Sequence, residues 1–485
     1  MSEGTAGDLN PGPVVHLQGQ GSVEGRVQDG VARFLGIPYA VAERWKAPKS
    51  PAPWQGTLFQ RRLARCPQPG RPSATSEGHI MEDDENCLQL NIWTPMSALA
   101  DSESCPKLPV LVYIHGGGGK SHSAHCPRES GHHLALAQGL CCVNINYRLG
   151  IFGFLAHPEL SQEDRENMAL GDKAGSGNYA MLDQLCALSW VQRHIANFGG
   201  DAQNVTIWGL SSGAQYVSTL LVSPAGQGLF HRAVVQSCAD LNNVRQLDSS
   251  CDVWLGKTAE QWGECVGQEL GCASGAGQLA AMRALPAAAL VAKTFVAAAH
   301  DCYEPAIDRR DPELSVKPWS SLEALHQGRF NKVPVLIGVT DHDGLGKVEL
   351  EQTLFQDART REELEALLNR EFPEASARVI SRFWPSEAAE AKAVHQTLSR
   401  LSNDLWYFAG SYYMSQLLAE ETPVFSYSFG GLKHSVHGSD AMYWRGSPKG
   451  TLPALMSTYL ANFAPTAQSG IRDTGRVCIL GTFRR

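Results

Sequence analysis

The sequence has no excess of positive charge and no long apolar run. Its 485 residues carry a formal charge of −8 at pH 7 and no basic stripe with interleaved aromatic residues, so no nucleic-acid partner is expected. No apolar run reaches the roughly 18 residues of a membrane span, and the first residues have neither the basic nor the apolar region of a signal peptide. We therefore expect no membrane span and a cytosolic protein, or a secreted one if a leader has been removed.

The cysteines show no metal-binding pattern. The chain has 13 of them, without a C-x-x-C pair and without a cysteine and histidine cluster at zinc spacing. Cys141, Cys142 and Cys186 lie within apolar runs, where a thiol usually serves as a small core residue. A metal site is therefore not indicated.

Short β-branched runs alternate with helical patterns along the chain. Such near-continuous apolar strands are typical of a mostly parallel sheet covered by helices on both faces, which is an α/β fold. The pattern of residues 178–199 predicts a helix with Met181, Leu185 and Leu188 on its buried face and Gly199 at its C-terminal cap. The expected strands are 110–114, 142–146, 204–208, 232–237, 333–339 and 423–429.

No internal repeat or low-complexity linker divides the chain. We therefore expect residues 1–485 to form one domain, with residues 1–13 as a flexible N-terminus. Residues 240–330 combine weak strand signals with alanine-rich helical pieces. We expect this segment to be a helical excursion over the sheet that could wall a substrate pocket.

The stretch "NVTIWGLSSGAQ" joins an expected strand to an expected helix through two adjacent serines. In the pattern G-x-S-x-G, a tight turn between strand and helix exposes the serine hydroxyl at the edge of the sheet. Gly209 and Gly213 leave room for such a turn. The pattern also arises by chance. Ser211 is therefore either a nucleophile or a polar turn residue, and the first reading requires a base, an acid and an oxyanion hole.

Other stretches supply these groups. The run "HGGGG" at residues 115–119 follows a strand and leaves backbone N–H groups free to stabilise negative charge. "VTDHDG" ends a later strand with Asp341 and Asp343, and "KHSVHGSD" contains His434 and His437. The order serine, acid, histidine is that of α/β-hydrolase triads. As an ordered set after strands, these residues indicate acyl-transfer chemistry.

These motifs together resemble the type B carboxylesterases, the family that includes the cholinesterases. The resemblance covers roughly residues 14–465 and rests on "FLGIPYA", "ENCLQLNIWTP", "VLVYIHGGGG", "NYRLGIFGFL", "LIGVTDHDG" and "VHGSD" in family order. It implies an α/β-hydrolase fold and a serine esterase that acts on a small-molecule ester without a cofactor. Residues 466–485 depart from the family pattern and are expected to form a divergent C-terminal tail.

Carried over position by position, the resemblance implies a Ser-His-Asp triad. Ser211 is the nucleophile, His437 the general base, and Asp343 the acid, at a position where the family usually has Glu. The implied oxyanion hole is formed by the N–H groups of Gly117, Gly118 and Ser212.

The resemblance also implies structural pairs. The family's first disulfide corresponds to Cys66 and Cys87, which would remain thiols in a reducing cytosol. The implied structural ion pairs are Arg44 with Glu85 and Arg148 with Asp183.

Two positions near the site depart from the family pattern. Leu210 replaces the Glu that usually precedes the nucleophile, and the loop 67–86 has no Trp that could face a quaternary ammonium group. Choline esters are therefore poor candidates, and we expect a small or medium, mainly uncharged ester. Asp343 is one methylene shorter than Glu, and Asp341 is the fallback acid if Asp343 cannot reach the histidine.

Two other functions remain open from the sequence. A triad and an oxyanion hole serve any acyl transfer, so the same site could open lactones, cleave thioesters or transfer acyl groups in a biosynthetic pathway. The family also contains adhesion proteins that keep the fold without the triad. A well-folded protein that is inert towards activated esters would favour this last reading.

Overall fold

The computed structural model describes most of the chain. The described residues are 12–59, 62–70, 72, 79–100, 106–241, 245–248, 257–294, 304–344, 358–385, 389–431, 435–447 and 450–466. The expected N-terminal and C-terminal segments, 1–13 and 466–485, lie almost wholly outside these residues, as does His434.

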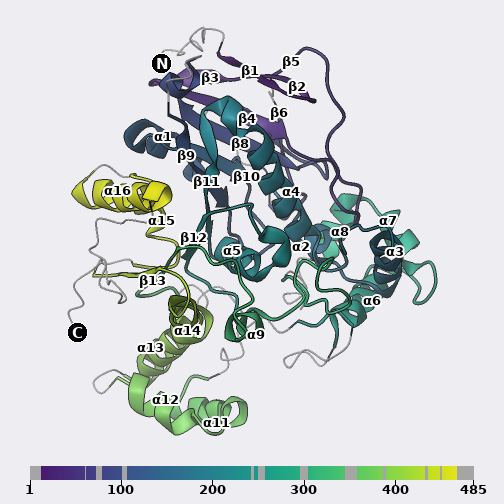
Figure 1. Ribbon diagram of the computed structural model, residues 1–485. Helices are drawn as coiled ribbons and strands as arrows, with labels where there is room; N and C mark the ends of the chain where they lie inside the picture. The colour runs from purple at the N-terminus through teal and green to yellow at the C-terminus, as the bar shows by residue number, and fades with distance from the viewer. Residues whose placement is uncertain are drawn as a thin grey trace, which may run out of the picture.

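A nine-stranded sheet forms the centre of the molecule (Figure 1). Six neighbouring strands, from β14 to β10, run parallel to one another. The remaining three continue the sheet as antiparallel strands. The six parallel strands are those expected from the apolar runs, and the α/β fold is confirmed. In order across the sheet, the strands are β14 (Val424–Phe429), β13 (Val335–Thr340), β12 (Arg232–Gln236), β11 (Gly200–Leu210), β9 (Leu108–Ile114), β10 (Cys141–Ile145), β8 (Gln89–Pro95), β4 (Val31–Pro38) and β3 (Arg26–Gln28).

A tight turn joins β3 to β4 at the antiparallel end of the main sheet. Asp29 and Gly30 in this turn both have positive φ, 50° and 78°, which suits such a turn.

Smaller strand groups lie outside the main sheet. The smaller groups are a sheet of β1 (Val14–Leu17), β2 (Gly21–Glu24) and β5 (Thr57–Leu58), and a parallel pair of β6 (Arg62–Arg65) and β7 (Ile80–Asp83).

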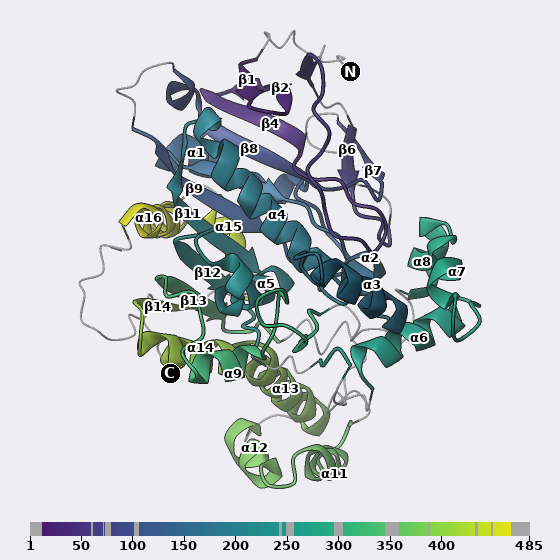
Figure 2. The ribbon, with the colours of Figure 1, turned by 45° about the vertical axis from the view of Figure 1, so that its right-hand side comes forward.

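Helices cover both faces of the main sheet (Figures 1 and 2). Alternate residues of each strand point to opposite faces, so Val112 and Ile207 pack in one core cluster while Leu111 and Trp208 pack in another. The first cluster includes α4 (Tyr179–His194), α5 (Ser212–Val222), α9 (Ser321–His326) and α14 (Ala409–Ala419). The second includes α1 (His132–Gln138), α15 (Ala441–Trp444) and α16 (Thr451–Thr466).

The helix expected over 178–199 is present as α4. It ends in a 3-10 turn, Ile195–Phe198, and Gly199 caps the turn with φ 81°. This left-handed conformation favours glycine because a side chain would crowd the backbone. The helix crosses the sheet in Figure 2 and delivers the chain to β11.

Where the segment from 240 to 330 is described, its named elements are helices joined by long loops. Of these described helices, α9 lies over the face of the sheet, where it contacts α5 and α14. Contacts of α6 with α3 and of α8 with α2 place the other helices beside those two, at one end of the molecule in Figure 2. The helices concerned are α2 (Gly150–Phe154), α3 (Pro158–Met168), α6 (Ala259–Glu269), α7 (Gln278–Arg283) and α8 (Ala287–Thr294).

A second helical group follows β13. Its helices are α11 (Arg361–Glu371), α12 (Ser376–Phe383) and α13 (Glu390–Asn403), which share a small apolar cluster of their own around Leu364, Leu368 and Leu398. α13 continues through a π-helical turn, η6 (Asp404–Phe408), into α14. The helical group therefore connects directly to the sheet. Among the described residues, no helix is both long and apolar enough to cross a membrane.

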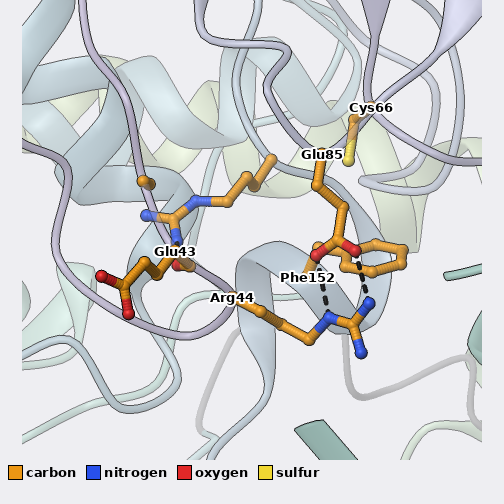
Figure 3. A pocket seen from close by; sticks show the side chains of 7 residues that line it. Glu43, Arg44, Cys66, Glu85 and Phe152 are labelled. Carbon is orange, nitrogen blue, oxygen red and sulfur yellow. Dashed lines mark hydrogen bonds and ion pairs between the residues drawn. The ribbon is translucent and has the colours of Figure 1, made fainter. Parts of the chain in front are cut away.

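Two ion pairs brace the region around α2. Arg44 Nε donates to Glu85 Oε2 at 2.8 Å and a second nitrogen bonds the other carboxylate oxygen, as Figure 3 shows, beside a pocket that Cys66 and Phe152 also line. Arg148 makes a fully buried bidentate pair with Asp183, whose carboxylate also accepts the Arg148 backbone N–H at 3.0 Å. The buried pair of Arg148 and Asp183 depends on complete hydrogen bonding, because either partner alone would be an unpaired buried charge.

Cys66 and Cys87 lie together as free, buried thiols, and the structure contains no disulfide between them. Cys66 Sγ accepts the backbone N–H of Leu149 at 3.1 Å. A hydrogen bond with Cys66 and burial raise the pKa of Cys87 well above its usual value. Burial and this hydrogen bond therefore disfavour the Cys87 thiolate, the form that attacks in disulfide formation.

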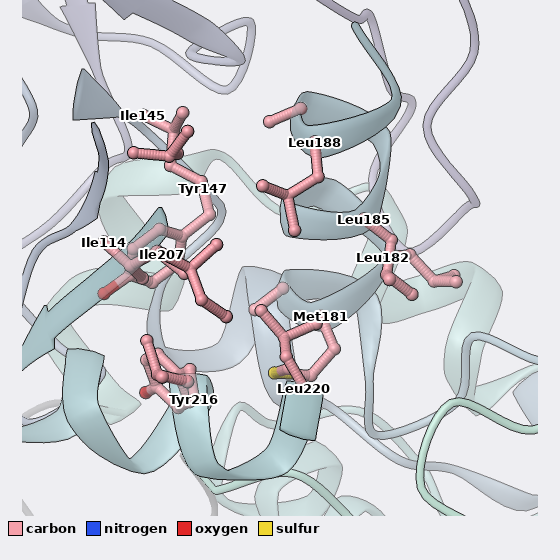
Figure 4. Packing of buried hydrophobic residues seen from close by; sticks show 14 of the residues in the cluster. Ile114, Ile145, Tyr147, Met181, Leu182, Leu185, Leu188, Ile207, Tyr216 and Leu220 are labelled. Carbon is pink, nitrogen blue, oxygen red and sulfur yellow. The ribbon is translucent and has the colours of Figure 1, made fainter. Parts of the chain in front are cut away.

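The main core fixes the ends of the two central strands (Figure 4). Ile114, the last residue of β9, and Ile207 of β11 are buried with Met181 and Leu185 of α4 and with Leu220 of α5. Each fully buried aliphatic side chain contributes about 1.5–3 kcal/mol of hydrophobic stabilisation. This packing therefore holds the carboxyl-terminal halves of β9 and β11 rigidly in place.

Candidate active site

Ser211 occupies a strained turn between β11 and α5. Its backbone has φ 59° and ψ −129°, an unusual conformation for a residue with a side chain, and its N–H donates to Gln236 O at 2.9 Å. A Cβ on Gly209 would lie 2.1 Å from Gly213 O, and one on Gly213 would lie 2.1 Å from Ile114 O. Only glycine fits at both flanks, so the packing of this turn explains the pattern around Ser211.

The glycine run after β9 passes directly against Ser211. A Cβ on Gly116 would lie 3.0 Å from Ser211 Cβ, and the next three glycines all have positive φ. Among the described residues, no acceptor bonds the N–H of Gly117 or Gly118. These two N–H groups lie in the loop beside Ser211 and are available to a negatively charged oxygen.

Ser212 contributes to this loop with its hydroxyl as well as its backbone. As the first residue of α5, it has no intrahelical acceptor for its N–H. Its Oγ accepts the N–H of Gly119 at 3.2 Å. The sequence suggested a role only for the Ser212 N–H, and the structure adds a bond that ties the glycine loop to the helix start.

His437 and Asp343 form the second half of the site. His437 Nδ1 lies 2.8 Å from Asp343 Oδ1, and the other carboxylate oxygen accepts the Thr340 N–H at 2.7 Å. Asp343 is fully buried, while the His437 side chain is 29% exposed. Because an ionised carboxylate only accepts hydrogen bonds, Nδ1 carries a proton and Nε2 is left as the acceptor.

The fallback acid lies elsewhere. Asp341 is exposed, and its Oδ1 accepts the Ser428 hydroxyl at 3.1 Å. Of the two aspartates, Asp343 is the one that the structure places on the histidine.

A second buried carboxylate, Asp440, lies behind the histidine loop. The Tyr427 hydroxyl donates to Asp440 Oδ2 at 2.8 Å. Burial and, to a lesser extent, the charge of Asp343 raise the pKa of Asp440 to about 6. Asp440 could not be singled out from the sequence, because one Asp after a histidine motif carries no pattern of its own.

His115 is not a second base. It stacks on Tyr147 with ring centroids 4.4 Å apart and is almost completely buried. Burial lowers the pKa of His115 to about 4, so the ring is neutral at neutral pH. It serves to pack the start of the glycine loop.

Leu210 connects the serine turn with the histidine loop. Its side chain lies 3.3 Å from the position that a Cβ on Gly438 would occupy, directly after His437. The contact is apolar and provides neither a counter-ion nor a hydrogen-bond acceptor. At this point the histidine loop therefore contacts an apolar side chain.

All of these residues follow strands at one edge of the sheet. β9, β11, β13 and β14 run parallel, so their carboxyl ends, which precede Gly117, Ser211, Asp343 and His437, lie on the same side. This is the edge at which open α/β sheets bind ligands. Within the described part of the chain, no group of three or more metal-binding side chains occurs.

Known proteins are similar to this chain in sequence and in fold. Residues 11–469 match the carboxylesterase family model. A fumonisin B1 esterase from Sphingopyxis macrogoltabida is 32% identical over 90% of this chain and 75% of its own. A para-nitrobenzyl esterase from Bacillus subtilis is 29% identical over 84% of this chain and 77% of its own. A solved PNB esterase structure, 25% identical, covers 96% of this chain and 91% of its own with a TM-score of 0.71. The chain therefore belongs to the carboxylesterase family and is a carboxylic ester hydrolase.

Proposed function

We propose that this enzyme cleaves small or medium, mainly uncharged carboxylic esters with Ser211 as nucleophile, His437 as base and Asp343 as the orienting acid. The observation that carries the proposal is the bond between His437 Nδ1 and Asp343 Oδ1 at 2.8 Å, at the same sheet edge as the strained Ser211 turn. This bond fixes the tautomer in which Nε2 can accept a proton.

The reaction follows from these roles. His437 Nε2 takes the Ser211 proton as Oγ attacks the ester carbonyl, and Asp343 stabilises the imidazolium that forms. The N–H groups of Gly117, Gly118 and Ser212 bind the oxyanion. The C–O bond to the alcohol then breaks, and the alcohol leaves with the proton from His437. Water, deprotonated by the same histidine, releases the acid and restores Ser211.

The preference for uncharged esters is supported by the apolar contact of Leu210 with the histidine loop. A carboxylate at this position would attract a cationic alcohol group, whereas leucine does not. The two curated relatives are named for esterase activity on fumonisin B1 and on para-nitrobenzyl esters. We extend to this chain only the ester class and not those particular substrates.

A labelling experiment tests the nucleophile. A fluorophosphonate probe is expected to modify Ser211, and Ser211→Ala is expected to lose both labelling and hydrolysis of para-nitrophenyl acetate. Ser218→Ala is the matched control and should keep activity, because Ser218 is a buried serine on the following helix, α5, and its hydroxyl donates to the Ala214 carbonyl. Retention of hydrolysis by Ser211→Ala would overturn the assignment.

The charge preference has its own test. Acetylcholine and 3,3-dimethylbutyl acetate have nearly the same shape and differ in charge. We expect kcat/KM for the neutral ester to be about tenfold higher, and Leu210→Glu to narrow this ratio where Leu210→Gln does not. Equal rates for the two esters in the wild-type enzyme would refute the preference.

A further inference from the structure

We propose that Tyr407 is a positioning residue that holds the ring of His437, and that the π-helical turn η6 exists to bring it there. The inference rests on the proposed role of His437 as the base. It assigns a function to a segment that lies between two ordinary helices and that no sequence motif marks.

The turn η6 is a local widening of one continuous helix. Asn403 and Ala409, which flank Asp404–Phe408, both have right-handed helical dihedral angles, so the chain passes from α13 to α14 without a break. π-Helical turns are rare because their hydrogen bonding is less favourable than that of an α-helix, and they occur frequently at functional sites. We therefore expect contacts with other segments to offset the less favourable hydrogen bonding of this turn.

The first contact is with the loop that carries the acid. Asn403 Oδ1 accepts the N–H of Gly344, the residue after Asp343, at 3.2 Å. A Cβ on Gly344 would lie 2.2 Å from Asn403 N, so the two backbones approach as closely as glycine allows. The start of η6 is thus fixed against the residue that follows Asp343.

The second contact is with the histidine itself. The ring centroids of Tyr407 and His437 lie 4.7 Å apart, with the planes tilted by 41°. Tyr407 is only 4% exposed, so its ring cannot swing away without disturbing the helix. Asp343 bonds one edge of the imidazole and Tyr407 packs on the ring, and together these contacts restrict rotation about both side-chain torsions of His437.

The two contacts act on the acid and the base from one rigid element. Asp343 reaches His437 although it is one methylene shorter than the Glu that the family pattern leads one to expect. Its loop must therefore be held close to the histidine. The segment from Asn403 to Tyr407 contacts Gly344, the residue after Asp343, and the ring of His437, and so maintains this approach.

The test compares Tyr407→Leu and Tyr407→Phe with Tyr412→Leu, a matched change of an exposed tyrosine on α14. Hydrolysis of para-nitrophenyl acetate is measured together with the rate of fluorophosphonate labelling. We expect Tyr407→Leu to lower kcat and the labelling rate about tenfold with KM changed less than about twofold, because the base is misoriented rather than the substrate released. Tyr407→Phe keeps the ring and should restore most of the rate, and Tyr412→Leu should leave both rates unchanged.

Three outcomes would overturn the inference. These are a kcat of Tyr407→Leu within twofold of wild type, a loss in Tyr407→Phe as large as in Tyr407→Leu, or an equal loss in Tyr412→Leu. If Tyr407→Leu does not fold by circular dichroism and thermal melting, Asn403→Ala serves instead. It should lower kcat at constant KM, and an unchanged kcat overturns the inference. His437→Gln distinguishes the proposed base from the proposed positioning residue. Activity in His437→Gln would contradict the role of His437 as base. Activity lost in His437→Gln but kept in Tyr407→Leu would contradict only the positioning role of Tyr407.

Discussion

Replacing Asp343 by Asn should nearly abolish hydrolysis without removing any atom of the site. Asp343 accepts hydrogen bonds on both oxygens, from His437 Nδ1 at 2.8 Å and from the Thr340 N–H at 2.7 Å. An asparagine at this fully buried position has only one acceptor oxygen for two donors. One of the two bonds must therefore be lost or reversed.

Either orientation of the amide misplaces the proton. If the Asn oxygen faces Thr340, its NH₂ group faces His437 and forces Nδ1 to become the acceptor. Nε2 then carries the proton and cannot take one from Ser211. If the amide is flipped, its NH₂ group faces the buried Thr340 N–H. Two donors then meet without an acceptor, which costs about 1–3 kcal/mol. The equivalent change in a serine protease lowers kcat by about four orders of magnitude, and we expect about the same here, or about 5 kcal/mol in the barrier.

The assay is steady-state hydrolysis of para-nitrophenyl acetate, with Asp341→Asn as the matched control. Asp341 is exposed and bonds Ser428, so its replacement should change kcat by less than about threefold. KM should remain similar in both variants, because the substituted carboxylates do not contact the substrate. A kcat of Asp343→Asn near that of the wild type, or a larger loss in Asp341→Asn, would refute the reasoning.

Two further predictions concern buried charges. Lys317 Nζ donates to Asp240 Oδ2 at 2.7 Å, and both side chains are fully buried. Because Lys317→Met leaves the carboxylate without its cationic partner, it should lower the free energy of unfolding by about 3–5 kcal/mol in urea titrations. A loss below about 1 kcal/mol would contradict this prediction. The pKa of Asp440 is raised from 3.8 to about 6. Between about pH 4 and 6 the folded state therefore retains this proton, whereas the unfolded state has released it. The free energy of unfolding falls as pH rises through that window. Asp440→Asn, which can still accept the Tyr427 hydroxyl, should therefore raise the free energy of unfolding by about 2–3 kcal/mol at pH 7.5 and by little at pH 4, and a gain that is equal at both pH values would contradict the role of the charge.

The parallel strands were predictable because strands covered by helices on both faces are mainly apolar. β9, β10, β11, β12, β13 and β14 each correspond to an expected run. β8 was not singled out, since its buried positions include the polar Gln89 and Asn91. Asn91 Oδ1 accepts the Gly36 N–H and Gln89 Oε1 accepts the Ala64 N–H, so these side chains are satisfied by partners that no local pattern reveals.

The chemistry-bearing residues of the site could be placed by motif, but their supports could not. Ser211 and the glycine run have spacings that a tight turn imposes, and these are visible in the sequence. The Ser212 hydroxyl bond, the buried charge of Asp440 and the contact of Tyr407 with the histidine depend on packing between distant segments. The π-helical turn has no sequence pattern that would distinguish it from the helices on either side.

The parallel arrangement of the strands also determines at which stage of folding the enzyme becomes active. Among the described strands, β14 comes last in the sequence and lies at the edge of the sheet, and His437 follows it. Parallel pairing joins segments that are distant in sequence, which makes it slow to form during folding. We therefore expect refolding molecules to regain helix and much of the sheet before they regain esterase activity. Turnover would report the docking of the final strand, and ester hydrolysis would be a sensitive measure of whether the whole chain has folded.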